Sequence, residues 1–298
     1  MKLNDNITGA IYMCLSMAGF AINDAIIKFA STDIGIYQSI FVRGFFATIL
    51  IGIVSWHKGI FTKIPNKADH NLIVLRTLAE VGATISFLTA LFYLPIANIT
   101  ALLQALPLTV TLAAAWFFGE AIGWRRGVAI IIGFIGVLII IQPGTNEFNI
   151  YSILGLVCVL FVTARDLIVR KFSANVTSLY VVFITAPAVT IVGGLLTLFY
   201  EGWLPMKGFE IMFLFIASSL IFVGYFFAVA AMRIGQVSFV TPFRYTIMIW
   251  AITLGYLIWG DIPNSLTLIG MSIVIGMGMF TFWREARLKK TQTKNIGL

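Results

Sequence analysis

The sequence predicts an all-α, polytopic membrane protein of ten transmembrane helices, arranged as two inverted repeats of five. Three observations predict this class. Hydrophobic residues make up 60% of the 298 residues and charged residues only 11%, whereas soluble domains have about 25% charged residues. The mean hydropathy is +0.99. Apolar runs long enough to cross a bilayer recur along the chain, and short motifs recur at nearly constant spacing.

Ten apolar runs, each of roughly 17 to 25 residues, have the length that a helix needs to cross about 30 Å of hydrocarbon. Barrel strands would instead alternate polar and apolar residues over about ten positions. The first run carries Asp24 and Lys28 and lacks a cleavage pattern, so we expect a span and not a signal peptide. The predicted spans are residues 7–30, 35–56, 71–93, 96–119, 126–142, 151–170, 178–200, 209–231, 237–259 and 264–284.

Basic residues predict the orientation, because short loops rich in Lys and Arg stay in the cytoplasm. Every second loop is basic, and the alternate loops are acidic or neutral apart from Lys207. We therefore expect a multi-pass membrane protein with both termini in the cytoplasm. The net charge of +8 lies in these loops, so we expect no nucleic-acid partner. The basic residues are Lys58, Lys63, Lys67, Arg125, Arg126, Arg170, Lys171, Arg233, Arg284, Arg287, Lys289, Lys290 and Lys294, and the acids are Asp33, Glu147, Glu201 and Asp261.

Short motifs recur once along the chain at an offset of 141 to 143 residues. Asp24 and Lys28 correspond to Asp166 and Arg170 at an offset of 142 (166 minus 24). Three further matches lie at nearly the same spacing. A unit of five spans used twice must cross the membrane in opposite senses. We therefore predict one five-helix repeat over residues 1–145 and a second, with a basic tail, over residues 146–298. The further matches are Gly119-Glu120 with Gly260-Asp261, Gly127 with Gly270, and Gly133 with Gly276.

Several of these motifs resemble the drug/metabolite transporter superfamily, in its ten-helix branch with paired EamA-type domains. The resemblance covers essentially the whole chain, although Asp261 stands where Glu is more usual. Within that branch, the chain is similar to the S-adenosylmethionine uptake transporters of intracellular bacteria in Asn23-Asp24 with Lys28, in Asp166-Leu167 and in Pro242-Phe243-Arg244-Tyr245. The motifs of the branch are Leu94-Pro95-Ile96-Ala97, Trp116-Phe117-Phe118-Gly119-Glu120, and Gly127 with Gly133-Phe134-Ile135-Gly136-Val137.

Charged residues inside the predicted spans are the first candidates for function, because a charge at membrane depth costs a few kcal/mol even on insertion scales. Asp24, Glu80 and Asp166 are the acids, and the bases at depth are Arg43, Arg76, Arg165 and Arg244. Two interpretations are open. The i, i+4 spacings of Asp24 with Lys28, Arg76 with Glu80 and Asp166 with Arg170 allow mutual neutralisation. Alternatively, Lys28 reaches the outer interface and leaves Asp24 facing a cavity.

We assign the candidates to two roles. Asp24 and Glu80 are expected to meet a cationic group, and Arg244 a carboxylate, because Pro242 loosens the helix just before it. Arg43, Gln104, Tyr245 and Trp250 complete the expected substrate-binding set, although Arg43 has the alternative of pairing with an acid and Trp250 of simple packing. The expected gating or coupling residues are Arg76, Arg165 and Asp166.

The sequence lacks the motifs of several classes of protein. There is no phosphate-binding GxxxxGK[ST] loop and no nucleophile elbow. His57 and His70 share one loop without a carboxylate cluster, so we expect no metal and no cofactor. The sequence therefore favours a secondary transporter of a small zwitterionic or cationic metabolite, such as S-adenosylmethionine or an amino acid, working by alternating access.

The sequence leaves three questions open. These are coupling to protons or to a counter-substrate, the direction of transport, and whether the protein is a monomer or a homodimer. The partners expected are the substrate and the lipid bilayer. An exporter of the same family is the main alternative. An intramembrane enzyme with Asp24, Glu80 and Asp166 as acid and base groups, a receptor or assembly subunit, and a channel are the others.

Overall fold

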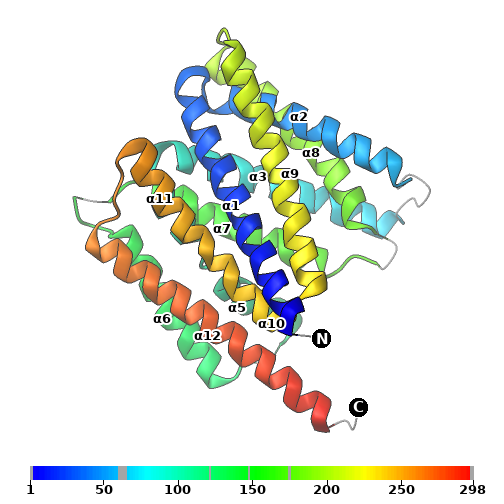
Figure 1. Cartoon of the computed structure of the whole chain (residues 1–298), viewed down its shortest axis with the longest axis vertical. Coiled ribbons are helices and arrows are strands. Elements are labelled where there is room, and N and C mark those ends of the chain that lie inside the picture. The colour runs from blue at the N-terminus through cyan, green and yellow to red at the C-terminus, as the bar shows by residue number, and fades with distance from the viewer. Residues whose placement is uncertain (1–2, 60–65, 121, 147, 174–175, 296–298) are drawn as a thin grey trace. The chain divides into compact units, whose positions relative to one another are not determined.

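A computed structural model describes residues 3–59, 66–120, 122–146, 148–173 and 176–295, and their regular structure is entirely helical (Figure 1). In these ranges, nine helices are long and apolar enough to cross a membrane. The predicted class of all-α, multi-pass membrane protein is therefore confirmed. Lys63 and Glu147 lie outside the described residues, as do the side chains of Arg287, Lys289, Lys290 and Lys294.

The first half of the chain forms five spans, of which the fourth is broken. Gln104 and Ala105 separate α4 from α5, and Pro107 lies in the first turn of α5, where a proline removes no helical hydrogen bond. The predicted span over residues 96–119 is thus present as two pieces. The helices are α1 (Leu3–Ile34), α2 (Ile36–His57), α3 (Lys67–Tyr93), α4 (Ile96–Leu103), α5 (Leu106–Phe118) and α6 (Trp124–Ile141).

The second half repeats this order, and its fourth span is broken as well. We expected one run over residues 237–259, but a 3-10 segment around Pro242 divides it, because a proline interrupts the α-helical hydrogen bonds. A π-helical turn extends α8. The elements are α7 (Tyr151–Val169), α8 (Ser178–Leu196), η2 (Thr197–Glu201), α9 (Gly208–Ile234), α10 (Val237–Val240), η3 (Thr241–Thr246), α11 (Ile247–Trp259) and α12 (Ser265–Asn295).

The bounds of the elements repeat at a fixed offset. Helices α3 and α9 have 27 residues each, and both of their ends differ by 141 residues (208 minus 67, 234 minus 93). Helices α5 and α11 have 13 residues each and differ by the same 141 (247 minus 106). Both end at a glycine in the left-handed conformation, Gly119 with φ 67° and Gly260 with φ 72°. This agreement supports a five-span unit used twice, while the boundary at residues 145 and 146 stays a prediction.

The chain folds into two compact units, and each unit takes segments from both halves of the sequence. The first unit comprises Met1–Ala21, Pro95–Ser152 and Val223–Leu298, and we call it the α6/α12 unit. The second comprises Ile22–Leu94 and Ile153–Phe222, and we call it the α2/α8 unit. In each unit the two helices of the name occupy equivalent places in the two halves.

Close packing of α2 against α8 organises the α2/α8 unit. A Cβ atom on Gly44 would lie 3.2 Å from Thr190 Cα, and one on Gly193 would lie 2.8 Å from Ile40 Cγ2. Contacts that advance on one helix and retreat on the other make the pair antiparallel. Thr48 and Thr190, 142 residues apart, share a hydrogen bond of 3.2 Å between their hydroxyls. Equivalent residues therefore meet each other on antiparallel helices, which is the relation that inverted repeats produce.

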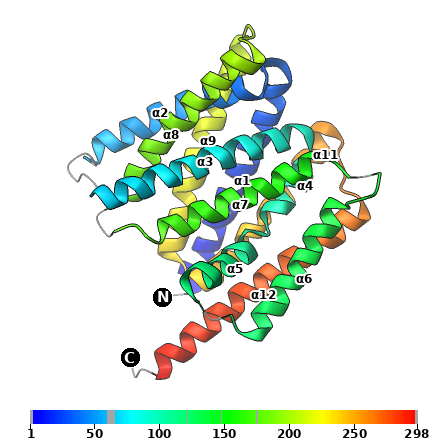
Figure 2. The ribbon, with the colours of Figure 1, turned by 180° about the vertical axis from the view of Figure 1, so that it is seen from behind.

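Helices α6 and α12 pack in the same antiparallel way, and both views show them side by side (Figures 1 and 2). A Cβ atom on Gly136 would lie 2.9 Å from Ile273 Cγ2, and one on Gly270 would lie 2.7 Å from the Gly136 carbonyl oxygen. Small residues allow helix backbones to approach closely where lipid supplies no hydrophobic driving force. Gly136 and Gly270 are therefore packing residues.

Glu201 caps the start of α2 from a distant part of the chain. Its carboxylate accepts hydrogen bonds from the backbone N–H groups of Ile36 (2.8 Å), Tyr37 (2.9 Å) and Gln38 (3.2 Å). The first turn of a helix leaves such donors without intrahelical partners, and a negative charge there is favourable. The π-helical turn that ends at Glu201 thus joins the end of the α8 span to the start of α2.

Candidate functional site

Six of the ten predicted site residues lie in the α2/α8 unit, on four helices. Helix α1 carries Asp24, helix α2 carries Arg43, helix α3 carries Arg76 and Glu80, and helix α7 carries Arg165 and Asp166. Three acids and three bases thus gather within one compact part of the protein. The four others, Gln104, Arg244, Tyr245 and Trp250, belong to the α6/α12 unit and are described separately.

Glu80 is the centre of a network of ion pairs. Arg76, one turn earlier on α3, approaches it with Nη2 to Oε2 at 3.2 Å. Arg165 of α7 donates from Nη1 to both carboxylate oxygens, at 3.1 and 3.2 Å. The three side chains are only 13%, 21% and 22% exposed for Arg76, Glu80 and Arg165, respectively. Charge-assisted bonds of this kind neutralise Glu80, so the pairing that its spacing with Arg76 allowed is confirmed.

A side-chain contact between α3 and α7 lies beside this network. A Cβ atom on Gly82 would lie 2.7 to 2.9 Å from the outer ring atoms of Phe161, so a larger residue there would displace this ring. Arg165 lies one turn after Phe161 and reaches Glu80, two residues before Gly82. Arg165 also donates from Nε to Oδ1 of Asp166 at 3.0 Å. The guanidinium of Arg165 therefore joins a carboxylate of the first half of the chain to one of the second.

Asp24 has a different environment from Glu80. Its side chain is partly exposed, and Oδ1 accepts a hydrogen bond of 2.9 Å from Nδ2 of the buried Asn23. Arg43 of α2 is the cation that acts on it electrostatically. A carboxylate has about four lone-pair positions, so this hydrogen bond leaves acceptor capacity for a ligand. Among the six charged residues, Asp24 is the acid best placed to receive a cationic group.

Lys28 corrects one expectation from the sequence. We expected its long side chain to reach the outer interface, but it is 8% exposed and donates to the main-chain carbonyl of Leu94. Leu94 follows the last residue of α3. A cation at the C-terminal end of a helix is favourable, because the last carbonyls carry partial negative charge. Lys28 thus caps α3, a role that its spacing from Asp24 could not reveal.

The break in each fourth span places two predicted residues at equivalent positions. Gln104 lies between α4 and α5, and Tyr245 lies 141 residues later in η3, just before α11. Gln104 donates from Nε2 to the Thr100 carbonyl at 3.2 Å. Tyr245 is 7% exposed, and its hydroxyl, directed at Gly278, has no hydrogen-bond partner among the described residues. Broken helices in transporters expose polar groups to a substrate, and an unsatisfied buried hydroxyl gains from a new partner.

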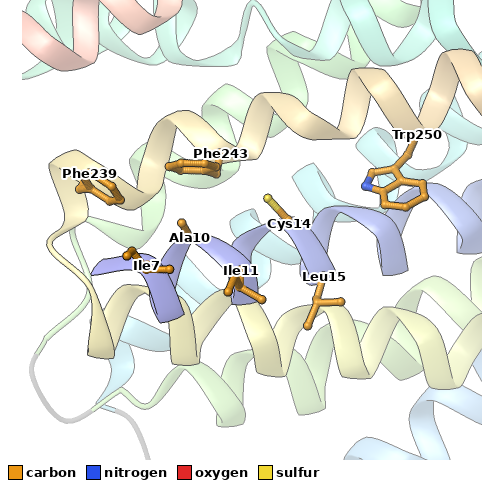
Figure 3. A pocket seen from close by; sticks show the side chains of 8 residues that line it. All are labelled: Ile7, Ala10, Ile11, Cys14, Leu15, Phe239, Phe243 and Trp250. Carbon is orange, nitrogen blue, oxygen red and sulfur yellow. The ribbon is translucent and has the colours of Figure 1, made fainter. Parts of the chain in front are cut away.

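Trp250 lines an apolar pocket of about 350 Å³ in the α6/α12 unit. Figure 3 shows its ring on the same side as Phe239 and Phe243, opposite the α1 residues that include Cys14. This aromatic side could stack against a planar ring. Arg244 is exposed, and it is not among the lining residues, nor are Gln104 and Tyr245. This pocket therefore brings Trp250 together with aromatic residues and not with the predicted carboxylate ligand.

Metal-binding side chains do not cluster in the part of the chain that the structure describes, where no group of three or more His, Cys, Asp or Glu is placed to hold an ion. Two free cysteines are present, Cys14 partly exposed and Cys158 buried.

Residues 7–142 match the model of the EamA-like transporter family. These residues are an EamA-like transporter domain. The EamA-like domain spans α1 to α6 and therefore contains Asp24, Arg43, Arg76, Glu80 and Gln104. The resemblance to the drug/metabolite transporter superfamily that the sequence motifs indicated is confirmed.

Three relatives with named functions are transporters. The chain is 26% identical over 286 residues to an S-adenosylmethionine uptake transporter of Rickettsia felis, covering 96% of each protein. It is 25% identical over 286 residues to a riboflavin transporter of Vibrio cholerae, covering 95% of each. It is 21% identical to the pseudopaline exporter CntI of Pseudomonas aeruginosa, over 90% of this chain and 93% of that one. The chain is therefore a multi-pass membrane transporter and not an enzyme.

A solved crystal structure shares the fold. It has a TM-score of 0.65 at 14% sequence identity and covers 97% of this chain and 99% of the other. The alignment spans both halves of this chain. The second half, α7 to α12, therefore shares the fold of the solved structure, as the EamA-like domain does.

Proposed function

We propose that this transporter is a secondary carrier of a small zwitterionic or cationic metabolite, of the S-adenosylmethionine or amino-acid class, in the inner membrane of a bacterium. The observation that carries the proposal is the contrast between two carboxylates at membrane depth. Glu80 is held by two arginines, whereas Asp24 receives a hydrogen bond from a neutral amide and keeps acceptor capacity. An acid inside a membrane helix is energetically costly, and such residues mark the pathways of substrates and ions.

Asp24 is the proposed partner of the substrate's sulfonium or ammonium group. Arg43 acts on Asp24 electrostatically, so a substrate cation would compete with Arg43 for it, and binding would be weaker and more readily reversed than to an isolated acid. The relatives named for S-adenosylmethionine uptake support this class. Glu80 takes part as a second acid only if Arg165 or Arg76 releases it.

The predicted residues of the α6/α12 unit are proposed to bind ligand groups within their own unit. Arg244, exposed in the 3-10 segment, stays the candidate for a carboxylate. The hydroxyl of Tyr245 and the amide of Gln104 are candidates for hydrogen bonds at the two helix breaks. Trp250 offers an aromatic face, as Figure 3 shows, to a purine or another planar ring.

The network of Arg76, Glu80, Arg165 and Asp166 is proposed to be a gate. It joins α3 of the first half to α7 of the second, through side chains that are only partly buried. Alternating access in inverted-repeat transporters moves one part of the protein against the other, so ion pairs between the halves are suited to form in one state and break in the next. Coupling would come from protons or from a counter-substrate exchanged at the same site.

Export is the second candidate function, and one observation favours it. The relatives include an exporter as well as uptake proteins, so the fold serves both directions. We propose uptake, a monomer or a homodimer, and cytoplasmic termini, because the described basic loops agree with the positive-inside rule.

Flux into proteoliposomes tests the proposed function. We expect purified protein to accumulate labelled S-adenosylmethionine, and excess unlabelled S-adenosylmethionine to compete more strongly than S-adenosylhomocysteine, which lacks the sulfonium charge. Asp24→Asn should reduce the flux at least tenfold. Asp33→Asn is the matched control, because Asp33 lies on the same helix but is exposed.

The outcomes separate the parts of the proposal. Flux of a neutral or anionic solute such as riboflavin, with none of S-adenosylmethionine or any amino acid, would overturn the substrate class. Equal flux in wild type and Asp24→Asn would overturn the role of Asp24. Protease access to the C-terminal tail shows which side of the liposome membrane the basic loops face. Transport that requires substrate on that side would establish export.

A further inference from the structure

A second groove lies on the α6/α12 unit, between the start of α6 and residues 277–284 of α12. Its volume is about 460 Å³, and the transport site described above uses none of its residues. Most lining residues are apolar or aromatic, and two are arginines. They are Trp124, Arg125, Val128, Ala129, Ile132, Met277, Phe280, Trp283 and Arg284.

The two arginines make the groove an anion site at one end. Arg125 and Arg284 are the ionisable groups among the nine lining residues, and no carboxylate accompanies them there. The guanidinium of Arg125 lies 5.3 Å from the ring centroid of Trp124, within the range of a cation–π interaction that fixes its place. The tail from residue 284 onward adds four more bases against the single acid Glu285. A negatively charged group is therefore the partner that this end fits.

The rest of the groove fits hydrocarbon. Val128 is 45% exposed and Ile132 37% exposed, and they follow Arg125 along α6 at helical spacing. Trp124 and Trp283, 73% and 53% exposed, also line the groove. Tryptophan and arginine at the end of a span lie at headgroup level. An anionic site followed by an apolar channel along a membrane helix has the two parts of a phospholipid.

We propose that this groove binds one anionic phospholipid, with its phosphate between Arg125 and Arg284 and an acyl chain along Val128 and Ile132. Basic pockets between membrane helices on the cytoplasmic side bind such headgroups, and the positive-inside rule places these helix ends there. A second copy of the chain fits less well. A two-fold interface brings the same patch of both subunits together, so the four arginines would face one another.

Native mass spectrometry of the purified protein tests the proposal, with dioleoyl phosphatidylglycerol and dioleoyl phosphatidylcholine as probes. We expect one phosphatidylglycerol molecule to bind tightly and phosphatidylcholine to bind weakly. A basic residue near the membrane surface contributes about 1 kcal/mol, so Arg125→Gln with Arg284→Gln should weaken phosphatidylglycerol binding about thirtyfold. Arg233→Gln is the matched control, since Arg233 is an exposed arginine at the end of α9 in the same unit.

A second variant separates loss of charge from loss of the groove. Ile132→Trp fills the apolar part and leaves both arginines in place, so phosphatidylglycerol should bind this variant several-fold more weakly than the wild type. Inorganic phosphate should not change phosphatidylglycerol binding to the wild type or to this variant. Equal binding of both lipids would overturn the proposal. Unchanged phosphatidylglycerol binding in the double variant would also overturn it, as would displacement of the lipid by inorganic phosphate. A third contradicting result is a wild-type dimer that carries no lipid and that the Ile132→Trp substitution dissociates.

Discussion

The ion pair between Glu80 and Arg165 can be tested by a double-mutant cycle. The single variants are Glu80→Ala and Arg165→Ala, and the third protein carries both. Removing Glu80 leaves Arg76 and Arg165 facing each other without the carboxylate that they share. Removing Arg165 leaves Glu80 still paired with Arg76 at 3.2 Å. We therefore expect Glu80→Ala to be the more destabilising of the two single variants.

The exposure of the two side chains sets the magnitude. Exposed pairs contribute about 0 to 1 kcal/mol, whereas breaking a buried pair costs about 3 to 5 kcal/mol. Glu80 and Arg165 are 21% and 22% exposed, and their two hydrogen bonds are charge-assisted. We expect a coupling energy of about 2 kcal/mol, so the double variant should be less destabilised than the sum of the single variants.

The assay measures the free energy of unfolding of each variant in mild detergent. A denaturant unfolds the protein reversibly, and circular dichroism monitors the loss of helix. Asp33→Ala, which removes an exposed carboxylate, provides the baseline for loss of a charge. Additive effects, with a coupling energy below about 0.5 kcal/mol, would refute the inference that this pair joins α3 to α7.

Two further predictions concern packing and capping. Glu201→Ala should destabilise the protein by about 2 to 3 kcal/mol, because three backbone donors of α2 lose a charged acceptor; the unfolding midpoint checks this, and a loss no larger than that of Asp33→Ala would contradict it. Gly270→Ala should cost about 1 to 3 kcal/mol through overpacking against the Gly136 carbonyl. Gly276→Ala on the same helix meets open space, so a similar melting temperature for both variants would contradict the packing argument.

The sequence was sufficient to predict the fold, and the reason is physical. Lipid requires every backbone group of a span to be satisfied within its own helix, so long apolar runs identify the spans one at a time. The repeat was detectable from a few charged and glycine residues, such as Asp24 with Asp166 and Gly119 with Gly260. The interruption at Thr241 to Thr246 was harder to predict, because Pro242 marks a weak point in a helix and gives no bounds for the 3-10 segment.

Ion pairs and hydrogen bonds between residues far apart in the chain could not be predicted from the sequence. The i, i+4 spacing of Arg76 and Glu80 predicted one ion pair correctly, but Arg165 is 85 residues from Glu80, and no local pattern joins them. Lys28 looked able to reach the interface because it lies close to the end of its predicted span. Its acceptor, the Leu94 carbonyl, is available to it only through the packing of α1 near the end of α3. Tertiary contacts of this kind decide which charged residues are held and which stay available.

Affinity for S-adenosylmethionine in wild type and in Asp24→Asn tests the central claim most directly. Equilibrium binding of the labelled compound to purified protein should weaken at least tenfold in Asp24→Asn, since a hydrogen bond to a charged group contributes about 1.5 to 3 kcal/mol. Asp33→Asn should bind as the wild type does. Equal affinity in wild type and Asp24→Asn would contradict the claim that this carboxylate receives the cationic group of the substrate.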